Sequence, residues 1–335
     1  MTDLTTSWLG LTLRSPLVVA ASPISHDLAA AKQAIAAGAG AIVMYSLFEE
    51  QVVAEQMAAH RFLDSRIDND AEARSFLPQS DVFALGTEPY LRQLEQLCQH
   101  LDVPVIASLN GNTPGGWTDY ARQLEARGAA AIELNLYDVV SNATRSAAQV
   151  ESDQLRIVDS VARQVSVPVT VKLSPFYSAL PSFATALKNA GARGVTLFNR
   201  FYQPDIDLDQ LDVDLKLAYS TPAELPLRLH ALAILHPCSG LDLACSGGVH
   251  SGTDAAKAIL AGASVVQIAS ALLEHGPAHL ANIQAELQQW LQDKQYLSVD
   301  EACGVMSMTS APDPQQWERL NYMKILQGWR PRGRG

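Results

Sequence analysis

The chain has 335 residues, of which 48% are hydrophobic and 18% are charged, and its formal net charge at pH 7 is −11. Such an acidic protein attracts neither nucleic acid nor an anionic membrane surface, so both are excluded as expected partners. No apolar run approaches 18 residues and Met1–Leu4 carries no basic residue, which predicts a cytoplasmic protein without a membrane span or signal peptide. The cysteines show neither metal-ligand spacing nor a disulfide framework, so we expect no metal site and four free thiols: Cys98, Cys238, Cys245 and Cys303.

One short pattern occurs four times along the chain: the end of an Ala-rich helix, a Gly, a small residue and an apolar strand. Its glycines are Gly38, Gly128, Gly191 and Gly262, which lie 90, 63 and 71 residues apart. Gly at that place is typical of a helix C-terminus. A second set of apolar strands, three of them opening at Pro16, Pro104 and Pro168, lies between the copies. Together the two sets predict eight strands, each followed by a helix, at 16–22, 41–46, 104–110, 131–137, 168–174, 194–200, 242–247 and 265–270. This alternation is typical of an α/β protein with a closed (β/α)8 TIM barrel.

Two connections on the C-terminal face of this barrel are longer than the fold needs, at 47–86 and 201–220. Long ordered loops at that face usually carry function, and the alternative is a contact between subunits.

We expect residues 1–305 to form the barrel and residues 306–335 to form a C-terminal extension. In the extension, Pro at the first turn and apolar residues on one face predict a helix over Pro314–Met323, packed on the barrel or on a neighbouring subunit. The basic end from Arg330 has the composition of a disordered tail.

The strongest chemical signal lies at the ends of the last two strands. The seventh strand runs into Gly247 and Gly248, followed by a capping-box pattern at Ser251–Asp254, and the eighth ends in Ala269 and Ser270. In a TIM barrel the loops after these strands commonly bind phosphate, because Gly amides and a helix N-terminus point at it. The sequence therefore predicts a ligand that carries a phosphate.

Four polar side chains are expected to line the same end of the barrel. Strand alternation places Lys172 inside, where its charge meets either a ligand or a salt-bridge partner such as Glu133. Asn135 and Asn199 close their strands on the active face, and Asn110 lies at a similar place with a greater chance of being a turn residue. A phosphate, a lysine and several amides together fit flavin mononucleotide (FMN), whereas a phosphosugar site would have more carboxylates.

From Leu9 to Gly304 the sequence resembles the dihydroorotate dehydrogenase family, in particular its soluble branch. The likeness is strongest in Glu133-Leu134-Asn135-Leu136, in Val171-Lys172-Leu173-Ser174-Pro175, and in the run from Ser246-Gly247-Gly248-Val249 to Ala271-Leu272. The resemblance implies an FMN barrel in which the substrate gives a hydride to flavin N5 while a base removes a neighbouring proton. It implies a homodimer as well. Carried over, it places Ala21 and Ser22 along the flavin, Asn135, Lys172 and Asn199 against flavin or substrate, and Gly247, Gly248, Ala269 and Ser270 around the phosphate.

The sequence departs from this family where the substrate would bind. The soluble branch has a Cys base shortly after the strand-four Asn, but this chain reads Asn135-Leu136-Tyr137-Asp138-Val139-Val140, with Asp138 at the base position. The family lysine after strand two aligns with Met44 or Tyr45. A substrate-binding Asn is missing from 74–78, and the Gly pair after strand six is replaced within 219–224. The residues expected to bind flavin are kept, whereas those expected to bind orotate are not.

Three interpretations follow. The first is an FMN-dependent oxidoreductase acting on the CH–CH group of dihydroorotate or a related dihydropyrimidine-like substrate, in pyrimidine biosynthesis or beside it, with Asp138 and Lys172 as catalytic residues. The second is a flavin-binding barrel that works with a redox partner protein and has no dihydroorotate activity. The third is a phosphosugar barrel without flavin. Fumarate, a quinone, NAD through a second subunit and another redox protein all remain possible electron acceptors.

Overall fold

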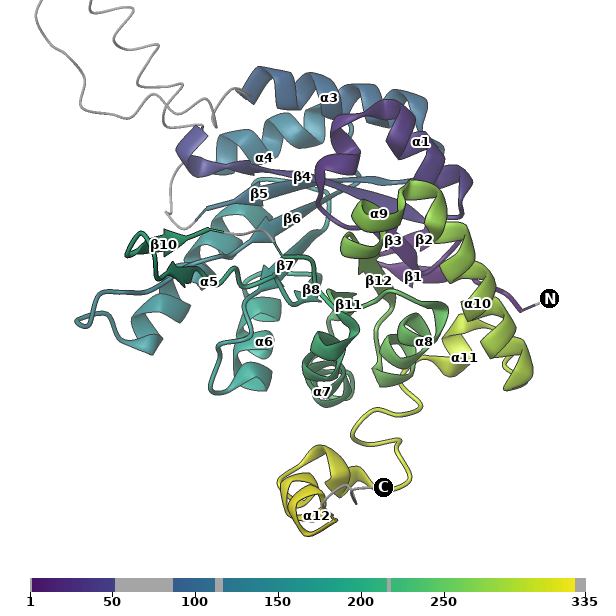
Figure 1. The fold of residues 1–335 in the computed structure, drawn as a ribbon. Coiled ribbons are helices and arrows are strands. Elements are labelled where there is room, and N and C mark those ends of the chain that lie inside the picture. Colours follow the sequence, from purple (N-terminus) through teal and green to yellow (C-terminus); the bar gives the residue numbers. More distant parts are fainter. Residues whose placement is uncertain (1, 52–86, 112–116, 216–217, 329–335) are drawn as a thin grey trace, which may run out of the picture.

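The computed structural model describes residues 2–51, 87–111, 117–215 and 218–328. In this part of the chain eight parallel strands close into one barrel, in the order β11-β12-β3-β4-β5-β6-β7-β8 (Figure 1). The strands are β3 (Leu17–Val19), β4 (Ala41–Phe48), β5 (Val105–Asn110), β6 (Ala131–Asn135), β7 (Val169–Leu173), β8 (Gly194–Leu197), β11 (Asp242–Ser246) and β12 (Val265–Ile268). The predicted (β/α)8 barrel is confirmed.

An outer layer of helices surrounds these strands (Figure 1). It consists of α1 (Leu28–Ala36), α3 (Thr87–His100), α4 (Trp117–Ala126), α5 (Ala147–Ala162), α6 (Leu180–Asn189), α7 (Leu225–Leu235), α8 (Gly252–Ala261), α9 (Ser270–His275) and α10 (Leu280–Asp293). The apolar sides of the strands and helices form one large buried core. No helix in the described part of the chain combines the length and hydrophobicity needed to span a bilayer.

The repeated Gly pattern does what its sequence predicts. Gly38, Gly128, Gly191 and Gly262 all have positive φ, between +97° and +117°, and each lies between a helix and the next strand. At Gly262 a side chain would also meet the ring of His236, because an added Cβ would lie 2.6 Å from the His236 ring atoms Cγ and Cδ2. This left-handed turn lets the chain leave the helix and enter the barrel within about three residues.

A small hairpin that the sequence analysis did not predict packs at the N-terminal end of the barrel. Strands β1 (Thr6–Trp8) and β2 (Leu11–Leu13) pair antiparallel, and Trp8 is completely buried. Trp8 and Leu13 belong to a second apolar cluster with inward residues of the barrel strands, such as Val43 and Ile106. The Leu9 N–H donates to Asp242 Oδ2 at 2.7 Å, which fixes the hairpin to β11. The bottom of the barrel is thereby filled.

The second long connection contains another hairpin, β9 (Asp205–Asp207) with β10 (Asp212–Asp214), on the C-terminal side of the barrel.

The C-terminal extension differs in detail from its prediction. Pro314–Trp317 forms only a 3-10 turn, and the helix, α12, runs over Leu320–Gly328. Two short elements before the extension were not predicted either: a 3-10 turn over Pro222–Glu224 (η3) and helix α11 (Val299–Ala302). Most of the 47–86 connection, including 74–78, and the tail from Arg330 lie outside the described residues.

Candidate active site

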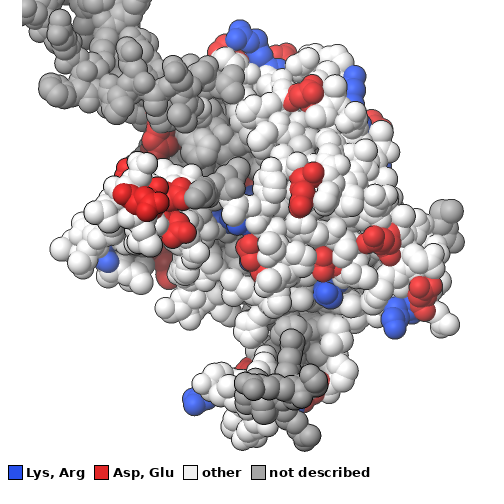
Figure 2. Space-filling model, in the orientation of Figure 1, with Lys and Arg blue, Asp and Glu red and all other residues white. Residues whose placement is uncertain are grey.

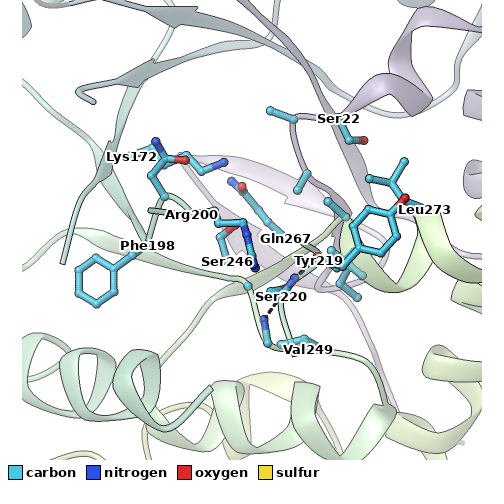
Figure 3. A pocket seen from close by; sticks show the side chains of 18 of the residues that line it. Ser22, Lys172, Phe198, Arg200, Tyr219, Ser220, Ser246, Val249, Gln267 and Leu273 are labelled. Atoms are coloured by element: carbon cyan, nitrogen blue, oxygen red, sulfur yellow. Dashed lines mark hydrogen bonds between the residues drawn. The ribbon is translucent and has the colours of Figure 1, made fainter. Parts of the chain in front are cut away.

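A cavity of about 380 Å³ opens among the C-terminal ends of β3, β7, β8, β11 and β12, which we call the main cavity (Figure 3). A second hollow of about 300 Å³, the side chamber, adjoins it over the ends of β4, β5 and β6. The residues lining both are Ala21, Ser22, Pro23, Lys172, Asn199 and Tyr202. The two hollows are therefore parts of one site, and most of the predicted site residues line it.

The predicted phosphate corner forms one wall of the main cavity. Gly247 and Gly248 both have positive φ, +91° and +80°, and an added Cβ at Gly248 would lie 2.7 Å from the Leu225 backbone nitrogen. The Gly248 N–H donates to the Ser220 hydroxyl at 3.1 Å, and that hydroxyl lies 2.8 Å from the Ser270 hydroxyl. Ala269 lines the same wall. Backbone amides and two hydroxyls thus converge where the sequence places a phosphate.

Lys172 reaches this site from β7, on the inward face that strand alternation predicts. Its Nζ lies 3.6 Å from Glu133 Oε1, and its side chain also lines both the main cavity and the side chamber. Glu133 is completely buried, and its Oε2 accepts hydrogen bonds from Gln267 at 2.8 Å and from Thr196 at 3.1 Å. The two alternatives for Lys172, a salt bridge and a place on the ligand wall, are therefore compatible.

The three predicted amides lie together in the side chamber. The Asn199 amide donates to the Asn135 carbonyl oxygen at 2.9 Å, and Asn110 is paired in register with Asn135 on the adjacent strand. Asn110 is the last residue of β5, so it belongs to the strand and not to a turn. This arrangement presents several hydrogen-bonding groups to a planar polar ligand.

Two arginines that the sequence analysis did not select also line the main cavity. Arg200 directly follows Asn199, and Arg228 extends from α7; both contact Glu224, with Nη–Oε distances of 3.1 Å and 3.4 Å. Arg228 also donates to the backbone oxygens of Ser246 and Glu224. Among the described residues, those that line the cavity include three cations, Lys172 among them, and no carboxylate. In a protein of net charge −11 this marks a site for an anionic ligand.

Among the described residues, buried polar atoms without a hydrogen-bond partner gather at the same cavity. They are Ser22 Oγ, Arg200 Nε and Gln267 Oε1, each belonging to a lining residue. Buried donors and acceptors of this kind are costly unless a ligand or water satisfies them. A ligand with both donors and acceptors along its length meets this requirement.

The side chamber carries an aromatic wall. The rings of His26 and Tyr45 lie 3.8 Å apart, and Tyr45 packs edge-on against Tyr90. Partial burial lowers the pKa of His26 from its usual 6.5, so its imidazole is neutral at pH 7. Burial conversely raises the pKa of the Cys245 thiol to about 12, so that thiol is protonated and cannot replace the missing Cys base.

Asp138 is not brought together with Lys172. It lines a separate hollow of about 400 Å³ between α5 and the loop after β7, and its carboxylate pairs with Arg145 at 3.3 Å. Its side chain is 18% exposed. The family resemblance points to this residue because it follows Asn135 at the position of the base, but its side chain lies at the hollow beside α5.

The fold and site together define a TIM barrel whose C-terminal face holds a cavity lined by three cations and by two consecutive glycines of positive φ. A family model described as dihydroorotate dehydrogenase matches residues 3–291, and the chain belongs to this family of oxidoreductases, which act on CH–CH groups. The predicted family is thus confirmed.

Three curated relatives show how far the similarity extends. The dihydroorotate dehydrogenase B (NAD(+)) catalytic subunits of Thermoplasma acidophilum and Desulforudis audaxviator are 28% and 27% identical to this chain. The alignments cover 91% and 90% of it, and 99% and 96% of the relatives. A putative dihydroorotate dehydrogenase A (fumarate) of Aeropyrum pernix is 30% identical, over 64% of this chain and 71% of its own.

Proposed function

We propose that this protein is an FMN-dependent oxidoreductase that oxidises dihydroorotate or a related dihydropyrimidine-like substrate. The observation that carries the proposal is the joined site of main cavity and side chamber. In this site the predicted phosphate corner, the amides and three cations occur together, in a member of the dihydroorotate dehydrogenase family. A phosphosugar does not need this additional chamber, which is lined by amides and aromatic rings.

The residues present fit FMN. Gly247, Gly248, Ala269 and Ser270 would hold its phosphate, Ala21 and Ser22 would lie along the ring, and Lys172 would face the pyrimidine edge. The unpartnered atoms of Ser22 and Gln267 supply a donor and an acceptor for such a ring system. When bound, FMN supplies a hydride acceptor at N5.

The protein's own residues would then orient the substrate and move its proton. The paired amides of Asn135 and Asn199, with Asn110, would hold a planar ring in the side chamber. Lys172 would stabilise negative charge that develops during reduction, while Glu133 keeps the ammonium in place. These positions leave one role to assign, the proton acceptor.

Two residues compete for that role. Asp138 has the position along the sequence that the family's base occupies, but it lines a different hollow and is paired with Arg145. His26 lines the side chamber itself, and its neutral imidazole is able to accept a proton. The geometry supports His26 as the base.

Anaerobic mixing of the purified protein with dihydroorotate tests the substrate. We expect the oxidised flavin absorbance to be bleached, with one orotate formed for each flavin reduced. A flavoprotein that stays oxidised under these conditions, but is reduced by dithionite, would reject dihydroorotate as the substrate and leave the redox-partner alternative.

We also propose that electrons leave through a second protein to NAD, because two relatives that each align with at least 90% of this chain are named catalytic subunits of NAD-dependent enzymes. A homodimer and a cytoplasmic location remain part of the proposal. The reduced protein should then be reoxidised slowly by NAD alone, which stopped-flow absorbance measures.

A further inference from the structure

Arg200 is the cation of the main cavity whose charge is least committed to the protein. Its side chain is 24% exposed, and its Nη1 donates to Glu224 Oε1 at 3.1 Å. Its Nε is buried and has no hydrogen-bond partner within the described structure. The guanidinium carbon also lies 5.8 Å from the centre of the Tyr202 ring. Arg200 also lines the main cavity, so its guanidinium lies at the cavity wall with a single carboxylate partner among the described residues.

Arg228, by contrast, is used by the fold. Its side chain is only 6% exposed, and it donates to the Ser246 and Glu224 backbone oxygens at 3.1 Å and 2.9 Å. Both arginines share the single carboxylate of Glu224, so this cluster of three side chains has a net charge of +1. The uncompensated charge belongs to the cation that has fewer protein partners, which is Arg200.

The contacts of Glu224 place this charge beside the phosphate corner. The same Oε1 that accepts from Arg200 also accepts from the Thr221 N–H at 3.2 Å, one residue after Ser220. Arg228 in turn lies against the corner, because an added Cβ at Gly247 would be 2.9 Å from its Nη2. Figure 3 labels Arg200 between Lys172 and Ser246, among the residues that line the main cavity.

We propose that Arg200 is a phosphate-binding residue. Its charge-assisted contact with the phosphate adds to the contacts made by the backbone amides of Gly247 and Gly248. This inference rests on the proposed function, since the phosphate is that of FMN. A doubly charged phosphate in a site of amides alone is neutralised incompletely, and a guanidinium at the cavity wall supplies the missing charge. The alternative is that Arg200 only ties the loop after β8 to Glu224.

Comparison of FMN with riboflavin, which lacks the phosphate, isolates this contact. The full-length protein is stripped of flavin, and the dissociation constants of both flavins are measured by fluorescence quenching. In Arg200→Gln we expect FMN binding to weaken by about 10- to 100-fold and riboflavin binding by less than about threefold. Arg193→Gln is the matched control, because Arg193 lies at the opposite end of β8, is 63% exposed and pairs with Asp242.

The outcomes distinguish the phosphate role of Arg200 from the proposed function as a whole. An equal loss of affinity for both flavins, or no loss for either, would overturn the phosphate role of Arg200 while FMN binding by the parent still supports the proposed function. If the parent binds neither flavin, the proposed function fails together with this inference. Arg200→Lys should recover part of the preference for FMN, since it restores the charge without the planar donor set.

Discussion

At the residue scale, the site is built around a buried charge pair whose two members have different surroundings. Glu133 lies wholly inside the barrel and is held by Gln267 and Thr196, whereas Lys172 faces the cavity. Removing one member of such a pair leaves an uncompensated buried charge, at a cost of about 3–5 kcal/mol. A substitution of Lys172 should therefore be combined with a substitution that neutralises Glu133.

Lys172→Met combined with Glu133→Gln should make the bound flavin harder to reduce than in Glu133→Gln alone. The ammonium stabilises the reduced, anionic flavin, so its loss lowers the midpoint potential. Potentials are measured by dye-coupled photoreduction. Equal potentials in the single and double variants would leave Lys172 as a salt-bridge residue only.

His26 and Asp138 make opposite predictions for the proton acceptor. His26→Gln should slow flavin reduction by dihydroorotate by about 10²–10⁴-fold, whereas Asp138→Asn should slow it less than about threefold. Stopped-flow absorbance measures both rates, and flavin content shows that the site is intact. A large loss in Asp138→Asn with none in His26→Gln would return the role to Asp138.

The same assignment fixes a pH dependence. His26 accepts a proton only when it is neutral, and burial lowers its pKa below 6.5. The rate of flavin reduction should therefore be constant at pH 7–8 and fall as the pH drops through that lowered pKa. Tyr45, which contacts the His26 ring, has a raised pKa caused by burial and stays protonated throughout this range. A decline that begins well above pH 7 would contradict the assignment.

At the element scale, the strands were predictable because each combines an apolar run with a Gly turn or a Pro start. All eight predicted strands are present, mostly shorter than expected, and β4 extends to Phe48. The hairpin β1–β2 was missed because three-residue strands have too little periodicity to read. The Gly and Asn residues of the site followed from strand ends, but Arg200, Arg228 and His26 did not. Arg228 reaches the site from α7 and His26 from the turn after β3, and the sequence pattern does not single out either position.

Trp8→Ala tests how much the β1–β2 hairpin stabilises the barrel. Trp8 is completely buried, so the truncation should lower the free energy of unfolding by about 3–5 kcal/mol, as measured by urea denaturation. Leu297→Ala is the control, since its side chain is 73% exposed and the change should stay within about 0.5 kcal/mol. A Trp8 variant as stable as the control would mean that the hairpin is dispensable to the fold.

At the scale of the whole molecule, charge and apolar surface are unevenly distributed. The acidic β9–β10 hairpin has exposed Ile206 and Leu211, and α12 exposes Tyr322 and Ile325 among other apolar residues. Figure 2 shows one dense cluster of acidic side chains at the left of the view, with further acidic side chains spread over the rest of this face. Figure 1 shows α12 projecting beyond the barrel helices, which agrees with a contact to a second subunit better than with packing on its own barrel.

Sedimentation velocity tests that contact. We expect the parent protein to be a dimer, and Tyr322→Glu combined with Ile325→Glu to shift it to a monomer, because two charges would be buried in an apolar interface. Flavin content should not change, since α12 does not line the cavity. A monomeric parent, or a charged variant that stays dimeric, would contradict a dimer through α12.

The FMN content of the purified protein is the most direct test of the proposed function. The protein should be yellow as purified, with flavin absorbance bands, and heat denaturation should release about one FMN per chain, identified by chromatography and mass. Protein purified without flavin should take up FMN with the same stoichiometry. A folded, colourless protein that binds no FMN would contradict the proposed function.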